Sequence, residues 1–164
     1  MLKPAVQKKI KTIFYSVIVF LIAVTVILTG ATFTDLNVYW YVSLNKPFHP
    51  PYWIHVVAWM IIFILITISA IIILSEKEKR KSKCPFALPL YLINAFLVPL
   101  YSVLFFGFRA ANLAFIETIF TLAAILLLIW CNYKISKTAA YLLMPYLLWI
   151  CYSVFLNAMI IFAN

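Results

Sequence analysis

Residues 52–75 read YWIHVVAWMIIFILITISAIIILS, a run of 24 residues without Asp, Glu, Lys or Arg. At a rise of about 1.5 Å per residue, a helix of this length extends about 36 Å, enough to cross the roughly 30 Å hydrocarbon core of a bilayer. Apolar residues follow one another here and do not alternate with polar ones, as they would in a strand of a membrane barrel. The run therefore predicts a transmembrane helix.

Charged residues divide the rest of the chain into four more runs of this kind. Three are uncharged over 23, 25 and 27 residues, and the remaining one, of 24 residues, contains a single acid, Glu117. Each is long enough to cross a bilayer. The sequence thus predicts an all-α integral membrane protein, a single domain over residues 1–164 that forms a five-transmembrane-helix bundle, with spans at about 12–33, 52–75, 86–107, 111–133 and 138–162.

The composition excludes an ordinary soluble domain. Hydrophobic residues make up 67% of the chain, charged residues only 10%, and the mean hydropathy is +1.10. A soluble domain has about 25% charged residues, and a chain of 164 residues could not bury so much apolar surface by itself. We therefore expect lipid to be the solvent for most of the chain.

Basic residues are distributed unequally between the two ends of the predicted bundle. Five spans place the N-terminal segment and the connections at 76–85 and 134–137 on one side, with eleven of the thirteen Lys and Arg residues. Lys46 and Arg109 lie on the other side. The positive-inside rule then predicts a cytoplasmic N-terminus, and we expect a multi-pass protein of a bacterial cell membrane. This topology explains the net charge of +9, so the lipid bilayer and not nucleic acid is the expected partner.

The connection between the first two spans, WYVSLNKPFHPPYW at 40–53, contains three prolines among aromatic residues. Proline lacks a backbone donor and disfavours helix in the residue before it, so this segment cannot continue a helix. Trp and Tyr favour the headgroup level, which accounts for Trp40 and Trp53 one by one. This preference does not explain a stiff loop whose conformation Pro50 and Pro51 restrict. Such a loop would suit a lid over a ligand cavity.

Polar and aromatic residues recur at helical spacing in the last predicted span. Tyr146, Trp149, Ser153 and Asn157 follow at steps of three, four and four, so they share one helix face. Polar groups in a bilayer core need partners, and this face should therefore point into the bundle. Hydrogen bonds to a neighbouring helix are an equally good explanation for Ser153 and Asn157.

Two further stripes lie in the second and third spans. Trp59 and Phe63 are four residues apart, and Asn94, Tyr101 and Phe105 share one face. A single aromatic stripe is more often helix packing than a ligand site. Together with the loop at 40–53, however, the stripes indicate a cavity with flat aromatic walls, which suits a large, flat, hydrophobic ligand.

Six blocks of residues carry a resemblance over about residues 40–157. They are Trp40-Tyr41-x-x-Leu44-x-Lys46-Pro47, Pro50-Pro51-x-Trp53 through to Trp59, Phe105-Phe106-Gly107-x-Arg109, Leu113-Ala114-x-x-Glu117, Ala140-x-Leu142-Leu143-x-Pro145-Tyr146-x-x-Trp149, and Leu156-Asn157. In this order and spacing they resemble the TspO/MBR family, the bacterial relatives of the mitochondrial translocator protein. The family fold is a five-helix bundle, which agrees with the number of spans predicted from the charges.

The resemblance implies a membrane receptor or transport-like protein that binds porphyrins, with protoporphyrin IX or heme as ligand, and other flat hydrophobic molecules such as benzodiazepines. It implies a role in regulating tetrapyrrole levels and no required cofactor. The pocket would lie under the first loop. Carried over position by position, its lining would be Tyr41, Trp59, Phe63, Tyr101, Tyr146, Trp149 and Ser153, and its lid Pro50, Pro51 and Trp53.

Whether the protein is an enzyme stays open. Some bacterial members degrade protoporphyrin in light, and Tyr41, Trp59 and Trp149 would then be the oxidisable groups beside the macrocycle. A structural membrane protein without a ligand is a second alternative. The family's tendency to dimerise suggests a homodimer, although the sequence has no GxxxG motif.

Several positions depart from the family pattern. Only Phe48 and His49 separate Lys-Pro from Pro-Pro, where the family usually has three residues. The family asparagine of the third span falls on Val98, and Asn94, one turn earlier on the same face, is the candidate replacement. The sequence after Asn157 lacks the family's cholesterol-recognition pattern. These departures bear on which ligand is bound and not on the fold.

The remaining reactive residues fit structural roles. We expect Glu117 to form an ion pair with Arg109 or to have a helix-end role, with a proton relay as the alternative. We expect His55 to be a hydrated residue near the membrane surface, with iron ligation to a porphyrin as the alternative. The three cysteines form no spacing motif and are expected to be unpaired, without a metal site. The sequence contains no Ser-His-Asp arrangement, HExxH, CxxC or glycine-rich phosphate loop, so it indicates no hydrolase, metal or nucleotide chemistry.

Overall fold

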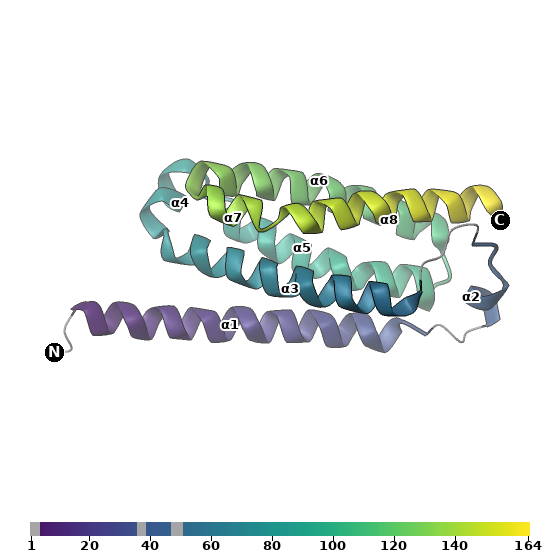
Figure 1. Cartoon of the computed structure of the whole chain (residues 1–164), viewed down its shortest axis with the longest axis horizontal. Coiled ribbons are helices and arrows are strands. Elements are labelled where there is room, and N and C mark those ends of the chain that lie inside the picture. The colour runs from purple at the N-terminus through teal and green to yellow at the C-terminus, as the bar shows by residue number, and fades with distance from the viewer. Residues whose placement is uncertain (1–3, 36–38, 47–50) are drawn as a thin grey trace.

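The computed structural model describes residues 4–35, 39–46 and 51–164 (Figure 1). Within these ranges five helical segments are long and apolar enough to cross a membrane: Ile13–Phe33, Tyr52–Ser75, Ala87–Gly107, Ala111–Ile135 and Lys137–Ala163. None of the described residues forms a strand. The predicted all-α, five-span membrane fold is therefore confirmed, and every predicted span end agrees to within two residues.

Helix α1 (Pro4–Phe33) lies along one flank of the bundle, beside α3 (Tyr52–Ser75) and α5 (Ala87–Ser102) (Figure 1). It starts eight residues before the predicted span, so the helix continues into the basic N-terminal segment. Just after its end, the hydroxyls of Thr34 and Ser102 lie 3.3 Å apart. This hydrogen bond joins the end of α1 to α5.

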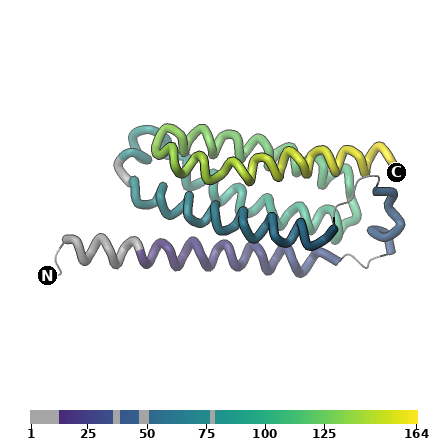
Figure 2. Tube along the Cα trace, viewed as in Figure 1, coloured from purple at the N-terminus to yellow at the C-terminus, as the bar shows by residue number. Residues whose placement is uncertain are grey.

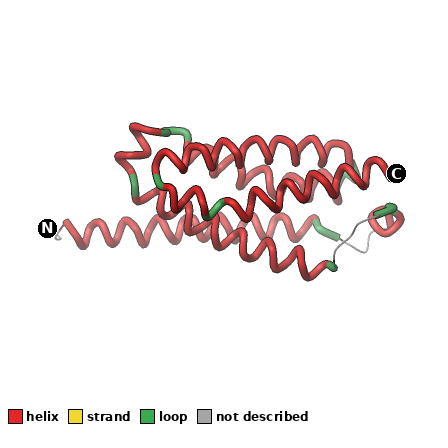
Figure 3. Tube along the Cα trace, turned by 45° about the horizontal axis from the view of Figure 1, so that its top comes forward, coloured by secondary structure: helices red, strands yellow, loops and turns green. Residues whose placement is uncertain are grey.

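The connections lie alternately at the two ends of the bundle. Helix α4 (Lys77–Lys83) and the turn between α6 (Ala111–Ile135) and α7 (Lys137–Tyr141) lie at the end where α1 begins (Figures 1 and 2). The short α2 (Tyr39–Ser43) lies beyond the other ends of the spanning helices (Figure 3). The basic connections thus share one end of the molecule, and the loop that contains α2 is at the opposite end.

The third span is not α-helical throughout. Helix α5 passes into a π-helix, η1 (Val103–Gly107), in which the Phe108 N–H donates to the Val103 carbonyl at 2.9 Å. Pro99 lies inside α5, one turn before the π-helix, and lacks the N–H that would bond to the Ala95 carbonyl. Arg109 then has a φ of 55°, a left-handed conformation that ends the helix and turns the chain into α6.

The last span, expected as one helix over 138–162, is divided. Helix α7 ends at Tyr141, and α8 (Met144–Ala163) begins with Pro145 in its first turn. Proline has no N–H for the carbonyl four residues back, which is that of Tyr141, and its ring would clash with that carbonyl. The helix therefore breaks before the proline, and Leu143 in the break is buried in the core.

The inner faces of α3, α6 and α8, with the break before α8, form one buried cluster of six residues. Its members are apolar apart from one hydroxyl: Ile62, Ile125, Leu128, Leu143, Tyr146 and Ile150. Large apolar side chains on the outer faces stay exposed, among them Phe120 at 64% and Leu148 at 67%. An exposed apolar surface of this kind is the one expected of helices surrounded by lipid.

The expectation that all cysteines are unpaired is wrong. Cys84, before α5, and Cys131, on α6, form a disulfide with their Cα atoms 5.6 Å apart. They are 47 residues apart in sequence, so only the packing of α6 against the start of α5 brings them together. Cys151 is free and exposed.

Candidate ligand-binding site

Aromatic side chains of α3 and α8 meet inside the bundle. The ring centroids of Trp59 and Phe63 are 5.4 Å apart on α3, and Trp59 lies 6.2 Å from Tyr146 of α8. His55, one turn before Trp59, contacts Trp149 at 5.3 Å with 82° between the ring planes. The structure thus brings together four of the residues that the sequence proposed as a ligand lining, in what we call the inner aromatic group: Trp59, Phe63, Tyr146 and Trp149.

Asn94 joins the inner aromatic group from α5. Its side chain is 5% exposed, its Nδ2 donates to the Leu90 carbonyl at 2.9 Å, and its Oδ1 accepts a hydrogen bond from the Tyr146 hydroxyl at 3.3 Å. Val98, one turn later on α5, packs against the buried cluster that contains Tyr146. The Asn94 amide therefore fixes the buried end of the Tyr146 ring.

A second set of rings, the outer aromatic group, lies beneath α2. Tyr41 is buried, with ring centroids 6.2 Å from Phe105 and 5.3 Å from Phe106. Tyr101 stacks on Phe105 at 5.5 Å with 11° between the planes, and Trp40 meets the same ring at 5.3 Å. Tyr41 and Tyr101 are thus neighbours, but around Phe105 and not beside Trp59 and Trp149.

Polar side chains of α8 lie between the two aromatic groups. The Tyr101 hydroxyl donates to Asn157 Oδ1 at 3.0 Å, and Asn157 Nδ2 donates to the Ser153 carbonyl at 2.9 Å. Ser153 Oγ donates in turn to the Trp149 carbonyl at 2.9 Å. Asn157 therefore makes the interhelical hydrogen bond that the sequence allowed for, whereas the Ser153 hydroxyl bonds within its own helix.

The predicted lid is described only in part. Pro50 lies outside the described residues, Pro51 is exposed immediately before α3, and Trp53 is 64% exposed. On the other side of the gap, the Asn45 N–H donates to Asn164 Oδ1 at 2.9 Å and the Asn45 carbonyl accepts from Asn164 Nδ2 at 3.0 Å. This pair of bonds fastens the loop to the end of α8.

Lys46 is the next residue along this loop. Its Nζ lies 3.8 Å from the centroid of the Tyr41 ring and donates to the Tyr41 carbonyl. Desolvation lowers the pKa of Lys46 and raises that of the Tyr41 hydroxyl, because burial penalises each charged form. Below both pKa values the pair carries one positive charge above the outer aromatic group.

Comparison with known proteins identifies the family of the chain. The sequence profile of the TspO/MBR family matches residues 17–163. This chain belongs to the TspO/MBR family. Tryptophan-rich protein TspO of Chlorobaculum tepidum is 30% identical over 137 residues, 82% of this chain and 86% of that protein. Translocator protein of Ovis aries is 33% identical over 121 residues, 72% of this chain and 70% of that protein. Tryptophan-rich protein TspO of Archaeoglobus fulgidus is 33% identical over 137 residues, 82% and 87% of the two chains.

Glu117, part of the family pattern, does not pair with Arg109 as expected. It is 5% exposed on α6, and its Oε1 accepts a hydrogen bond from Thr121 Oγ1 at 2.5 Å. Arg109 is exposed at the turn before α6, where its left-handed backbone follows the π-helix. Among the described residues no three His, Cys, Asp or Glu side chains are grouped so that they could hold a metal ion.

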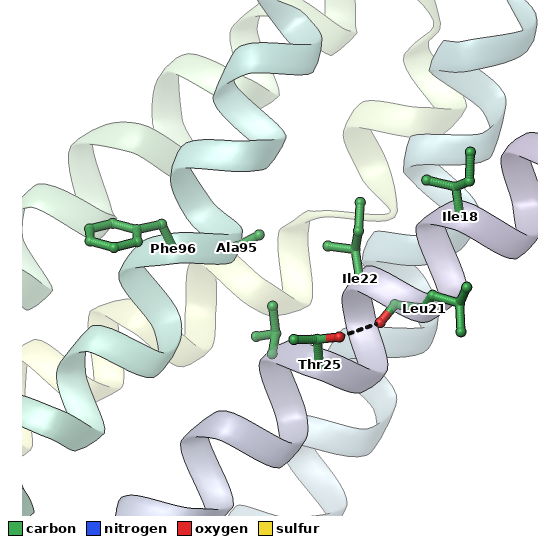
Figure 4. A pocket seen from close by; sticks show the side chains of 7 residues that line it. Ile18, Leu21, Ile22, Thr25, Ala95 and Phe96 are labelled. Carbon is green, nitrogen blue, oxygen red and sulfur yellow. Dashed lines mark hydrogen bonds between the residues drawn. The ribbon is translucent and has the colours of Figure 1, made fainter.

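A cavity of about 390 Å³ lies away from both aromatic groups, between α1 and α5. Figure 4 shows the residues that line it, which are Ile18, Leu21, Ile22, Thr25, Val26, Ala95 and Phe96. The one hydroxyl among them, that of Thr25, donates to the Leu21 carbonyl at 2.9 Å. This cavity is therefore an apolar crevice on the flank of the bundle and differs from the pocket expected under the first loop.

Two features of the site were missed by sequence reasoning. His55 contacts Trp149 and is not simply a surface residue; its position four residues before Trp59 was a signal that both lie on one face. A separate polar cluster joins Ser69, Tyr91 and Asn132, with Asn132 Nδ2 donating to the Tyr91 hydroxyl at 2.7 Å. It is contributed by three helices, and no local spacing indicates it.

Proposed function

We propose that this TspO/MBR family member is a membrane receptor or transport-like protein for porphyrins, protoporphyrin IX or heme among them, and that it takes part in regulating tetrapyrrole levels. The observation that carries the proposal is the meeting of Trp59, Phe63, Tyr146 and Trp149 from two helices. Flat π surfaces in an apolar interior favour a flat aromatic ligand. The ovine relative carries the name translocator protein, which fits a transport-like role.

Binding would exchange one set of aromatic contacts for another. The rings of the inner aromatic group touch one another, so a macrocycle must displace some of these contacts. Aromatic pairs contribute about 0.5–1.5 kcal/mol each, and a stacked porphyrin restores contacts of the same kind. Trp59 and Trp149 are only partly buried, so they are the rings with room to move.

Titration of the purified protein with protoporphyrin IX in the dark tests the proposal through tryptophan fluorescence. We expect saturable quenching, and about tenfold weaker binding in Trp149→Ala, which removes a wall of the site. Trp130→Ala is the matched control, since Trp130 on α6 is 56% exposed and belongs to neither aromatic group. Quenching without saturation, or an equal loss in both variants, would contradict the proposal and leave helix packing as the role of these rings.

Light-dependent oxidation of bound protoporphyrin, with dissolved molecular oxygen as the oxidant that is reduced, is the second candidate function. Trp149 and Trp59 both pack against the buried cluster that contains Tyr146, so their oxidisable indoles lie within the proposed site, whereas the third candidate, Tyr41, lies in the outer aromatic group. Illuminating the titrated sample separates the two functions. Loss of the Soret band in the wild type but not in Trp149→Phe, with binding retained, indicates an enzyme. A stable Soret band indicates a receptor alone.

We also propose an orientation and an assembly. Helix α4 and the turn between α6 and α7 carry the basic residues of the connections. They face the cytoplasm of a bacterial cell, because positive charge is retained on that side of the membrane. Trypsin added to inside-out vesicles should then cleave the Lys77–Lys83 segment, and trypsin added to right-side-out cells should spare it.

Chemical cross-linking in detergent tests the proposed homodimer, since a monomeric band alone would exclude it.

A further inference from the structure

Two lysines at the basic end of the bundle lie over exposed aromatic rings. Lys134 Nζ is 3.3 Å from the centroid of the Trp130 ring, and Lys137 Nζ is 5.6 Å from that of the Tyr133 ring. The Tyr133 ring meets the Tyr141 ring edge-on, with the two centroids 6.5 Å apart. These exposed residues form what we call the basic aromatic face: Trp130, Tyr133, Lys134, Lys137 and Tyr141.

The basic aromatic face points away from the bundle. Trp130, Tyr133 and Lys134 are three and four residues apart along α6, so they share one side of the helix. Cys131 and Asn132, between them in sequence, are buried on the other side. The outward side of a membrane helix meets lipid, and Trp and Tyr near a helix end lie at the headgroup level. The face therefore meets the headgroups of the leaflet at the basic end.

The two positive charges of this face lack a negative partner. In the part of the chain that the structure describes, neither Lys134 nor Lys137 forms an ion pair, and Glu76 pairs with Lys79 instead, at 3.1 Å. An aromatic ring attracts a cation but accepts no strong hydrogen bond, and each ammonium group has three N–H donors. An anion between the two lysines would receive charge-assisted hydrogen bonds, which are stronger than neutral ones.

An apolar stripe leads from Lys134 into the membrane. Leu127 and Phe120 precede it by seven and fourteen residues on the same side of α6, and they are 54% and 64% exposed. At about 1.5 Å per residue they lie roughly 10 and 21 Å from Lys134 along the helix, whereas the hydrocarbon of one leaflet is about 15 Å thick. The stripe thus covers the depth that one acyl chain occupies.

We propose that the basic aromatic face binds an anionic phospholipid of the surrounding leaflet. Its phosphate lies between Lys134 and Lys137, and one acyl chain follows the stripe of Leu127 and Phe120. Zwitterionic phospholipids are disfavoured, because their own ammonium group is repelled by the two lysines. The site shares no residue with the inner and outer aromatic groups, so the inference does not depend on porphyrin binding.

Native mass spectrometry of the full chain in detergent tests the inference, with phosphatidylglycerol and phosphatidylcholine of the same acyl chains as probes. We expect the wild type to bind phosphatidylglycerol about thirtyfold more tightly, because two lysines contribute about 1 kcal/mol each. The double variant Lys134→Gln/Lys137→Gln should lose this preference. Lys81→Gln/Lys83→Gln is the matched control, since it removes the same charge from exposed positions on α4, and it should keep the preference.

The results that would overturn the inference are distinct from one another. Equal affinities of the wild type for the two lipids, or a preference that persists in Lys134→Gln/Lys137→Gln, would show that these lysines select no phospholipid. An equal loss in the two double variants would assign the preference to net charge and not to this face. Displacement of the lipid by inorganic phosphate at the same concentration would reveal a site for a free anion.

Discussion

Tyr146 combines burial and polarity in one side chain of the candidate site. It is 1% exposed, and its hydroxyl donates to Asn94 Oδ1 within the bundle. Tyr146→Phe removes that donor and leaves a buried amide oxygen without it, which costs about 1 kcal/mol. We expect a lower midpoint of thermal unfolding in detergent. Tyr141→Phe, at a position 62% exposed on α7, should leave the midpoint unchanged. Equal midpoints for all three proteins would show that the bond contributes nothing.

Residue periodicity predicted the inner aromatic group but not the other contacts. Trp59 and Phe63, like Tyr146 and Trp149, are three or four residues apart, and helical spacing alone places such pairs on one face. Lys46 over Tyr41 and the Cys84–Cys131 disulfide depend on the path of loops and on helix packing. Sequence spacing does not encode those paths, so these contacts were missed.

Asn164 is the residue through which α8 holds the loop that contains α2. Its side chain makes both hydrogen bonds to the Asn45 backbone. Asn164→Ala removes both and should raise amide exchange of residues 41–46 about thirtyfold, since each bond contributes about 1 kcal/mol and 1.4 kcal/mol corresponds to a factor of about ten. Asn45→Ala is a matched control because it keeps the backbone groups that Asn164 contacts. Hydrogen–deuterium exchange read by mass spectrometry makes the comparison. The account of this fastening fails if the two variants exchange alike.

The helices themselves are less regular than the apolar runs suggested. The break before Pro145 follows from a missing N–H, whereas Pro99 lies one turn before the π-helix and its missing N–H concerns the Ala95 carbonyl. The apolar runs indicate continuous helices through both prolines, as membrane helices allow, so neither the break nor the π-helix was predicted. The π-helix bears directly on the candidate site, because it contains Phe105 and Phe106.

At the scale of the whole molecule, the positions of charge determined most of the fold. Apolar runs between charged residues gave five spans, and the odd number separates the basic connections from the loop that contains α2 (Figure 1). The described rings of the predicted lining fall into two groups, connected through Tyr101, Asn157 and Ser153, where one pocket was expected. Distances between helices decide this division, and they depend on packing throughout the bundle.

The central claim is that a porphyrin binds against the inner aromatic group, and the indole N–H signals of ¹⁵N-labelled protein in micelles test it most directly. A bound macrocycle shifts the signals of nearby protons through its ring current. On addition of protoporphyrin IX we predict large shifts for Trp59 and Trp149 and none for Trp130, which belongs to neither aromatic group and is 56% exposed. Unshifted signals of Trp59 and Trp149 at saturating ligand, or shifts confined to Trp53 and Trp130, would contradict the account.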